Sequence, residues 1–229
     1  MHQTAQDRQA RILDLLREEQ FLPIASLTER FQISVATARR DLAELETEGL
    51  LRRTHGGAVS LNQAGQDAPH AARLVSFPAE KAAIGAAAAA LIADGDAVLL
   101  DAGTTALEVA KCLKERTGLT VISNGIDIVN ELTGINGNRV YSVGGEFTDT
   151  NRSFSGPLAE EFIRHFTVDK LILNTTAIDI ARGLICTASP QNASLQRSML
   201  AAARRTIIVA DASKLMKSSL SVTARLDDL

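Results

Sequence analysis

The sequence contains few cysteines and no pattern that would pair them. Its 229 residues include only Cys112 and Cys186, which lie far apart and belong to no Cys-x-x-Cys pair. Disulfide frameworks and structural zinc sites need closely patterned cysteines. The sequence therefore predicts two reduced thiols and no metal site.

No hydrophobic run is long enough to cross a bilayer. The longest, around residues 84–93, is mostly alanine and contains Gly85, whereas a membrane-spanning helix needs about 20 apolar residues. Alanine favours helices, so this run predicts a packed helix. The polar N-terminal residues show no signal-peptide pattern, and we expect a soluble, cytoplasmic protein without a membrane partner.

The chain also lacks an excess of positive charge. Its formal net charge is -3, which does not indicate nucleic-acid binding. Within residues 1–58, which contain no lysine, positive charge is concentrated at Arg39-Arg40 and Arg52-Arg53. Affinity for DNA would then come from a few phosphate contacts per protomer, which predicts a dimer on paired half-sites.

Residues 34–53 carry the strongest local signal. Ser34 is a typical helix-capping residue, and we expect a helix that Gly49 ends. Its buried stripe is predicted to be Val35, Ala38, Leu42 and Leu45, which recur at helical spacing. The opposite face has no bulky side chain that would hold it away from a DNA groove, and it comprises Ala36, Thr37, Arg40 and Ala43, with Arg39 at its margin.

Two shorter helices are predicted before this one, at residues 8–19 and 26–31, separated by an extended stretch around Pro23. Three helices with a tight turn before the last form a helix-turn-helix. A helical interaction module is the alternative. Residues 50–59 favour DNA binding, because a winged domain needs a basic strand and the Gly56-Gly57 pair would let the backbone approach phosphate.

The predicted DNA-binding residues differ in role. Arg40 is the candidate for reading guanine, and Arg39 and Arg53 are candidates for holding phosphates. We expect Asp41 to pair with an arginine. His55 would touch the DNA backbone or remain a solvated residue at the wing tip. The full set is Ser34, Ala36, Thr37, Arg39, Arg40, Arg52, Arg53 and His55.

Residues 8–59 resemble the DNA-binding domain of the DeoR family of bacterial transcriptional regulators. The matching strings are R-x-x-x-I from Arg8, S-V-A-T-A-R-R-D-L from Ser34, and E-G-L-L-R-R-T-H-G-G-A from Glu48. The resemblance implies a winged helix-turn-helix repressor whose third helix reads the operator. The family usually has a larger aliphatic residue at the position of Ala38, which implies looser packing under this helix.

A polar stretch then separates two parts of the chain that differ in their sequence patterns. We assign residues 1–59 to the winged helix-turn-helix domain, 60–72 to a linker and 73–229 to a second domain. In the second domain, strand patterns alternate with helical ones, which predicts a Rossmann-like α/β fold with a mostly parallel sheet. The strands are expected at 97–100, 119–122, 139–143, 170–173 and 206–210, and the helices at 107–114, 126–132, 158–166 and 194–205.

Polar loops follow all five predicted strands, at the edge where such folds bind ligands. The first loop offers Asp101, Gly103, Thr104 and Thr105 before a helix, which favours an anion, although helix capping by either threonine is an alternative. A phosphate-bearing ligand is therefore predicted, without a P-loop or dinucleotide fingerprint and without a cofactor. The remaining loop residues are Asn124, Gly144, Gly145, Glu146, Asp179 and Lys214.

The second domain also resembles the DeoR-family sensor domain, whose fold is similar to ribose-5-phosphate isomerases and CoA transferases. The matching strings are Arg73, E-K-x-x-I-G from Glu80, and then D-A-G-T-T, S-N-G, V-G-G-E and D-A-S-K. The resemblance implies a phosphorylated sugar-like effector, with its phosphate near Lys81, Thr104 and Thr105. Hydroxyl contacts or site shape are implied for Asp101, Asn124, Glu146, Asp179 and Lys214, each of which could instead form a cap or a local salt bridge.

The chain departs from the family pattern at several positions. Asn192 and Gln196 stand where a Glu and a Lys are usual, and Asn174 and Ala177 stand near usual glycines. The sequence also stops at Leu229, where we would expect a final strand-and-loop segment. These departures imply a different effector or weaker effector binding.

The sequence thus favours a repressor of a sugar or polyol operon. Its predicted partners are double-stranded operator DNA, a phosphorylated sugar-like effector and further copies of itself in a dimer or tetramer. The alternative is a sugar-phosphate isomerase or deaminase with a regulatory head, using Asp101, Glu146 or Asp179 as base. No compact acid–base string is visible, so we predict no catalytic residue.

Overall fold

The chain divides into two compact units, Met1–Ala72 and Arg73–Leu229. The computed structural model describes residues 4–19, 21–54, 56–60 and 70–229. Most of the expected linker, and His55, lie outside the described residues. Each unit has its own hydrophobic core.

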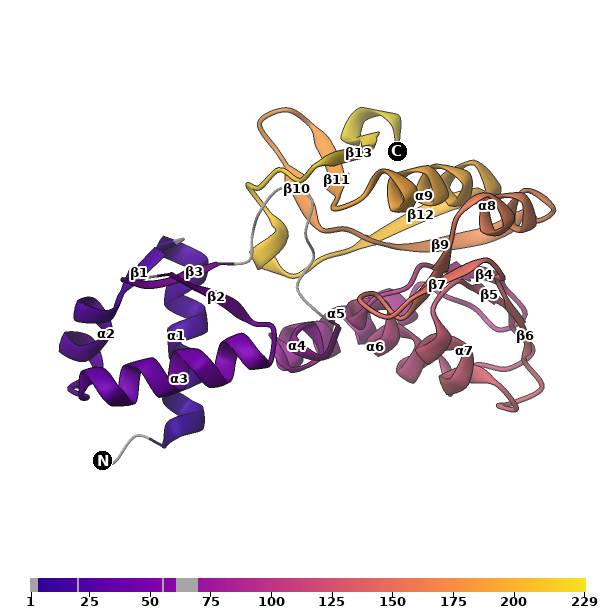
Figure 1. The fold of residues 1–229 in the computed structure, drawn as a ribbon. Coiled ribbons are helices and arrows are strands. Elements are labelled where there is room, and N and C mark those ends of the chain that lie inside the picture. Colours follow the sequence, from indigo (N-terminus) through magenta and orange to yellow (C-terminus); the bar gives the residue numbers. More distant parts are fainter. Residues whose placement is uncertain (1–3, 20, 55, 61–69) are drawn as a thin grey trace. The chain divides into compact units, whose positions relative to one another are not determined.

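The first unit has three helices and a small antiparallel sheet (Figure 1). The helices are α1 (Ala5–Glu19), α2 (Ile24–Phe31) and α3 (Val35–Thr47). The strands β1 (Phe21–Pro23), β2 (Leu51–Thr54) and β3 (Gly57–Ser60) pair in the order β1-β3-β2. This is the predicted three-helix arrangement with a wing. Strand β1 was not predicted, and α2 begins two residues earlier than expected because Pro23 occupies its N-cap position.

The core of the first unit confirms most of the predicted apolar stripe. Ala38, Leu42 and Leu45 are at most 2% exposed. Val35 is 47% exposed, so its predicted burial was wrong. It is the first residue of α3, one turn before the buried contacts begin at Ala38.

Gly57 is required by the packing of the sheet. A Cβ atom built on Gly57 would lie 2.0 Å from the backbone oxygen of Leu22, whereas one on Gly56 would meet nothing within 4 Å. Gly57 faces Pro23 in the β1–β3 pairing. This glycine therefore has a packing reason that the sequence interpretation, a close approach to phosphate, did not include.

The second unit is built on five parallel strands, which confirms the predicted fold class. In spatial order they are β12 (Ala203–Val209), β9 (Val168–Asn174), β4 (Ala97–Leu100), β5 (Thr120–Ser123) and β6 (Arg139–Ser142). Helices α5 (Pro78–Ala89), α6 (Thr104–Leu113) and α7 (Ile126–Leu132) share one core with the sheet. Helices α8 (Pro157–Arg164) and α9 (Pro190–Ala202) share the other, so both faces are covered (Figure 1).

The strand order reverses next to β4. The chain runs from β4 to β5 and β6 on one side and then continues with β9 on the other side of β4. Ligands of open parallel sheets bind outside the carboxyl ends of the strands at such a reversal. Here those ends are Asp101, after β4, and Asn174, the last residue of β9.

Short antiparallel elements complete the second unit and were not predicted. A hairpin of β7 (Glu146–Thr148) and β8 (Ser153–Ser155) follows β6. A second sheet has the order β10-β11-β13. The strands of this sheet are β10 (Ala177–Asp179), β11 (Leu184–Thr187) and β13 (Ser221–Arg225). Three short helices are α4 (His70–Val75), η1 (Ala212–Lys214) and η2 (Leu226–Asp228). Within the described residues, no helix is both long and apolar enough to span a membrane.

Candidate functional site

The N-terminus of α3 is capped, and the outward face of this helix is basic. The Ser34 side chain accepts a hydrogen bond from the Thr37 backbone N–H at 3.1 Å, which satisfies one of the free N–H groups at the start of the helix. Ala36, Arg39 and Arg40 are exposed. Neither arginine forms an ion pair with any described residue. Two guanidinium groups therefore project from this helix without an ion-pair partner among the described residues.

A buried ion pair holds α3 against α1. Arg8 donates from Nε to Asp41 Oδ2 at 2.6 Å and from Nη2 to Asp41 Oδ1 at 2.9 Å. Asp41 is 2% exposed, and a two-point contact of this kind fixes orientation as well as distance. The predicted pairing of Asp41 with an arginine is confirmed, and the partner is the arginine of the N-terminal string.

The wing is joined to α3 by a second acidic residue. Glu46 accepts the backbone N–H of Arg53 at 2.8 Å and its Nε–H at 2.6 Å. Both side chains remain partly exposed. The predicted phosphate-binding residue Arg53 therefore already has a protein partner. The side chain of Arg52 and the whole of His55 lie outside the described part of the chain.

In the second unit, Asp101 is the centre of a buried polar network at the strand-order reversal. Gln196 Nε2 donates to Asp101 Oδ2 at 2.8 Å and to the backbone oxygen of Asn174 at 3.0 Å. The Gln196 Oε1 atom accepts from the Thr223 hydroxyl at 2.7 Å. Asn174 Nδ2 donates to the backbone oxygens of Asp101 and Ala102. Hydrogen bonds from the side-chain amides of Asn174 and Gln196 thus connect the carboxyl ends of β4 and β9.

Burial dominates the electrostatics of Asp101. It raises the pKa of this carboxyl to about 6, although hydrogen bonds from Gln196 and Asn174 act in the opposite direction. No cation contributes to this shift. The lysine that the family resemblance places at position 196 would supply one, and Gln196 supplies only a dipole.

The start of α6 has no side-chain cap. Its N-cap residue is Gly103, so the alternative in which a threonine caps this helix was wrong. A Cβ atom on Gly103 would lie 2.8 Å from the Asn174 side chain, which explains the glycine. Thr104 and Thr105 are about 5% exposed. Uncapped N–H groups beside two hydroxyls suit an anion.

Lys81 lies in a second charged cluster at the end of β12. Its ammonium group donates to the backbone oxygen of Arg73 and, at 2.6 Å, to that of Ser76. Burial lowers the pKa of Lys81 to about 8, and Lys214 and Arg73 lower it further, while Asp211 and Glu108 raise it. The structure therefore brings together Lys81 and Lys214, two predicted effector residues.

Arg73 links this cluster to the β7–β8 hairpin. Its Nη2 donates to the Thr150 backbone oxygen at 3.2 Å and to Asn151 Oδ1 at 2.7 Å. The first residues of the second unit are consequently held at two points. The side chain of Arg73 is anchored at the hairpin, and its carbonyl is anchored at Lys81.

The other predicted effector residues are placed unequally. Asn124 is buried after β5 and accepts the Ala102 N–H through Oδ1 at 2.8 Å, so it shapes the first loop. Gly144, Gly145 and Glu146 follow β6 and are exposed. Asp179 lies on β10, outside the parallel sheet, and accepts hydrogen bonds from Ser218 and the Arg182 N–H. Its pKa is lowered by these contacts.

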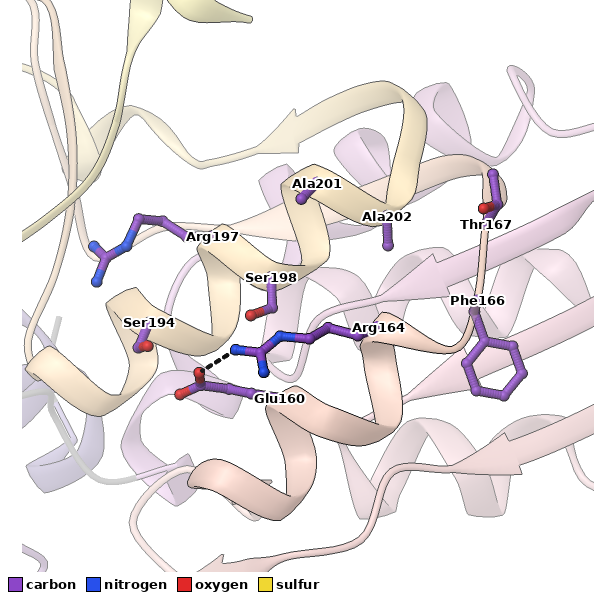
Figure 2. A pocket seen from close by; sticks show the side chains of 9 residues that line it. All are labelled: Glu160, Arg164, Phe166, Thr167, Ser194, Arg197, Ser198, Ala201 and Ala202. Atoms are coloured by element: carbon purple, nitrogen blue, oxygen red, sulfur yellow. Dashed lines mark ion pairs between the residues drawn. The ribbon is translucent and has the colours of Figure 1, made fainter.

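A pocket of about 490 Å³ lies between α8 and α9 (Figure 2). None of the predicted effector residues lines it. Its residues Thr167 and Ala202 lead into β9 and β12, so it lies at the amino ends of these strands, away from the polar loops. Arg164 in this pocket is paired with Glu160 at 3.5 Å.

Three residues near the carboxyl ends were missing from the predicted effector set. They are Asn174, Gln196 and Asp211, all of which contact or influence predicted residues. Asn174 and Asp211 could have been found because they follow strand patterns directly. Gln196 was named only as a departure from the family pattern, and its contact with Asp101 could not be predicted because it comes from the middle of α9 and reaches Asp101 only through the fold.

Comparison with known proteins gives matches to both units. Residues 8–64 match the DeoR-like helix-turn-helix domain, and residues 76–229 match the DeoR C terminal sensor domain. The chain is 66% identical to the transcriptional repressor AccR of Agrobacterium fabrum over 226 residues, covering 99% of this chain and 88% of that protein. It is 33% identical to the transcriptional regulator GlpR of Haloferax volcanii, over 97% of this chain and 87% of that one.

Among solved structures, ribose 5-phosphate isomerase A from Methanocaldococcus jannaschii is similar with a TM-score of 0.45. The two chains are 14% identical, and the match covers 61% of this chain and 55% of the other.

Proposed function

Because this chain belongs to the DeoR family of transcriptional regulators, we propose that it represses an operon of sugar or polyol metabolism by binding its operator. A phosphorylated sugar-like effector in the second unit controls operator affinity. The active form is a homo-oligomer in the cytoplasm that presents two DNA-binding units to paired half-sites.

The observation that carries this proposal is the basic face of α3. Arg39 and Arg40 are exposed on a capped helix, and Arg53 lies on the adjacent wing. In a winged helix-turn-helix, such a helix enters the major groove, where an arginine reads guanine and others hold phosphates. The proposed contacts come from Ser34, Ala36, Thr37, Arg39, Arg40, Arg52, Arg53 and His55.

The effector is proposed to bind at the carboxyl ends of the parallel strands. The uncapped start of α6 would take the phosphate, helped by the hydroxyls of Thr104 and Thr105. Lys81 and Lys214, which lie close enough to influence each other, would supply positive charge to the same phosphate. Asp101, Asn124 and Gln196 hold the loop in shape, because their polar atoms are already hydrogen-bonded to one another or to the backbone.

Lys81 offers a route from the effector to the DNA-binding unit. Its ammonium holds the carbonyls of Arg73 and Ser76, in the segment that follows the linker. A phosphate next to Lys81 would compete for these donors, because an anion binds an ammonium more strongly than a neutral carbonyl does. Release of the segment would change the placement of the DNA-binding units and thus operator affinity.

No observation favours the isomerase or deaminase alternative. Two of its candidate bases are engaged, since Asp101 accepts Gln196 and Asp179 accepts Ser218. The third, Glu146, is exposed.

An electrophoretic shift assay with the full chain and the DNA upstream of its own gene tests the proposal. We expect a sequence-specific complex that weakens steeply with salt. A thermal-shift screen with phosphorylated sugars and polyols then identifies the effector. A ligand at 100 times its Kd stabilises by about 2.7 kcal/mol. Failure to form any specific complex would refute the repressor proposal.

A further inference from the structure

Glu46 is an acidic residue next to a surface that is proposed to face DNA. It lies in the last turn of α3, and Arg53 lies on the edge strand β2. A carboxylate at this place should repel phosphate, and a DNA-binding face would gain affinity without it. Its contacts suggest a different role.

The turn after α3 fixes the distance between Glu46 and the wing. Gly49 has a φ of +70°. The Gly49 N–H donates to the backbone oxygen of Glu46 at 3.0 Å, and the Leu50 N–H donates to the backbone oxygen of Leu45 at 2.8 Å. This is the hydrogen-bonded turn that commonly ends a helix at glycine. The backbone therefore returns past the last turn of α3, and β2 starts within reach of the Glu46 side chain.

Both carboxylate oxygens of Glu46 are used, and both bind Arg53. Oε1 accepts the backbone N–H at 2.8 Å, and Oε2 accepts the Nε–H at 2.6 Å. The first contact covers an N–H on the open edge of the sheet, and the second fixes the direction of the guanidinium group. These hydrogen bonds lower the pKa of Glu46, so its ionised form is the one that makes them.

The terminal nitrogens of Arg53 are left available. Neither Nη1 nor Nη2 forms a hydrogen bond with a described residue, and the side chain is 45% exposed. A guanidinium group can bind a carboxylate through Nε and still present its two Nη groups to a second anion. A lysine has no such fork, because its three N–H donors share one nitrogen and cannot present two parallel N–H groups to a phosphate while another atom of the side chain binds the carboxylate.

We propose that Glu46 is a positioning residue for DNA binding, which holds Arg53 by its backbone N–H and Nε–H so that the two Nη groups grip one operator phosphate. The inference rests on the proposed function, since it assumes that the wing meets DNA. It predicts that an acidic residue strengthens binding to a polyanion.

The test compares single variants of the full chain by fluorescence anisotropy with operator DNA at several salt concentrations. Glu46→Ala is expected to weaken binding by about tenfold per DNA-binding unit, the effect of losing one charge-assisted hydrogen bond. The plot of log K against log salt should become less steep by about 0.9 per unit, because one phosphate contact is lost. This slope is independent of the fraction of folded protein.

Glu48→Ala is the matched control. Glu48 is exposed on the same turn, its side chain forms no hydrogen bond or ion pair with the described residues, and its removal changes the net charge equally. We expect Glu48→Ala to leave affinity unchanged or to raise it slightly. Arg53→Lys keeps the charge but should behave like Glu46→Ala. Adding Glu46→Ala to Arg53→Ala should have no further effect.

The outcomes separate the two proposals. If the wild-type chain forms a specific complex and Glu46→Ala binds as tightly as Glu48→Ala, the role of Glu46 is refuted and the repressor proposal stands. An equal loss from Glu46→Ala in the Arg53→Ala background refutes it too, because the effect would not pass through Arg53. Absence of a specific wild-type complex overturns both proposals.

Discussion

At the scale of single residues, the polar network around Asp101 shows how Gln196, at a position where the family usually has a lysine, satisfies the buried carboxylate by hydrogen bonding. The carboxylate is buried without a cation, and Gln196 satisfies it with one N–H while Thr223 satisfies the Gln196 oxygen. Each polar atom of Gln196 is thus hydrogen-bonded, which avoids the cost of an unpaired buried group. The charge of Asp101 remains uncompensated, and this has a measurable consequence.

The stability of the second unit should depend on the protonation of Asp101. Its native pKa is about 6, above the ordinary value of 3.8, so the folded chain binds more protons than the unfolded one between these pH values. The free energy of unfolding should therefore fall as pH rises from about 4 to about 6, by roughly 2–3 kcal/mol from this group.

Urea unfolding of the wild type and Asp101→Asn across pH 4–7 measures this effect. The other titrating groups are common to both proteins, so their contributions cancel in the difference. The wild type should lose stability relative to Asp101→Asn as pH rises through the window. A difference that stays constant with pH would contradict the raised pKa.

At the scale of elements, close approaches of backbone decide which residues are tolerated. Strand β3 of the wing passes so close to β1 that Gly57 has no room for a side chain. In the second unit, Gly85 of α5 meets the backbone of Glu108 on α6, where a Cβ atom would lie 2.8 Å away. Both glycines allow two elements to pack, and neither has a positive φ.

The wing offers a clean comparison between two adjacent glycines. Gly57→Ala should destabilise the first unit by at least about 2 kcal/mol, because a rigid backbone oxygen blocks the new methyl group and strain of this kind typically costs 1–3 kcal/mol. Gly56→Ala should be nearly neutral, since nothing lies within 4 Å of its Cβ position. Thermal unfolding of the two variants checks this. Equal melting temperatures would show that β1 can move away.

Lys81 tests the proposed coupling between effector and operator. Lys81→Met removes the donors to the carbonyls of Arg73 and Ser76 while keeping a long apolar side chain. We expect specific DNA binding to persist and its response to an effector from the thermal-shift screen to be lost. Lys111→Met on α6, which removes an exposed lysine paired with Glu108, is the control and should respond like the wild type.

A Lys81→Met protein whose operator affinity still changes with effector as in the wild type would place the coupling elsewhere. A loss of DNA binding without effector would show that the contact of Lys81 with residues 73–76 sets the DNA-competent state itself.

At the scale of the whole molecule, the charge distribution supports our proposal that two DNA-binding units act together on one operator. The net charge is -3, and the basic residues of the first unit that are proposed to touch DNA are few. Each phosphate contact adds only a modest, salt-dependent increment to affinity. Pairing two units on one operator makes the second binding event intramolecular, which multiplies affinity without any new contact.

Removal of one operator half-site should therefore weaken binding by at least about a hundredfold, the usual range of such linkage. Anisotropy titrations with a complete operator and with a half-site of equal length measure the ratio. Comparable affinities for the two DNAs would mean that a single unit binds on its own and that pairing is unnecessary.

The amino-acid sequence alone determined the elements with strong periodicity and the resemblance to the family. The strand at Ala97–Leu100 and the helix at Ile126–Leu132 were predicted with their observed bounds, because local patterns of apolar residues encode them. The winged helix-turn-helix and the parallel sheet followed from such patterns. Short strands such as β1 and β10 were missed, since three residues carry too little pattern.

Only the tertiary structure decided which polar residues act on one another. Arg8 and Asp41, Glu46 and Arg53, Asp101 and Gln196, and Lys81 and the Arg73 carbonyl are pairs separated by 7 to 95 positions. Sequence spacing cannot indicate such contacts, because they depend on how helices and strands cross. For the same reason, the uncapped start of α6 and the close approach at Gly57 could be seen only in the folded chain.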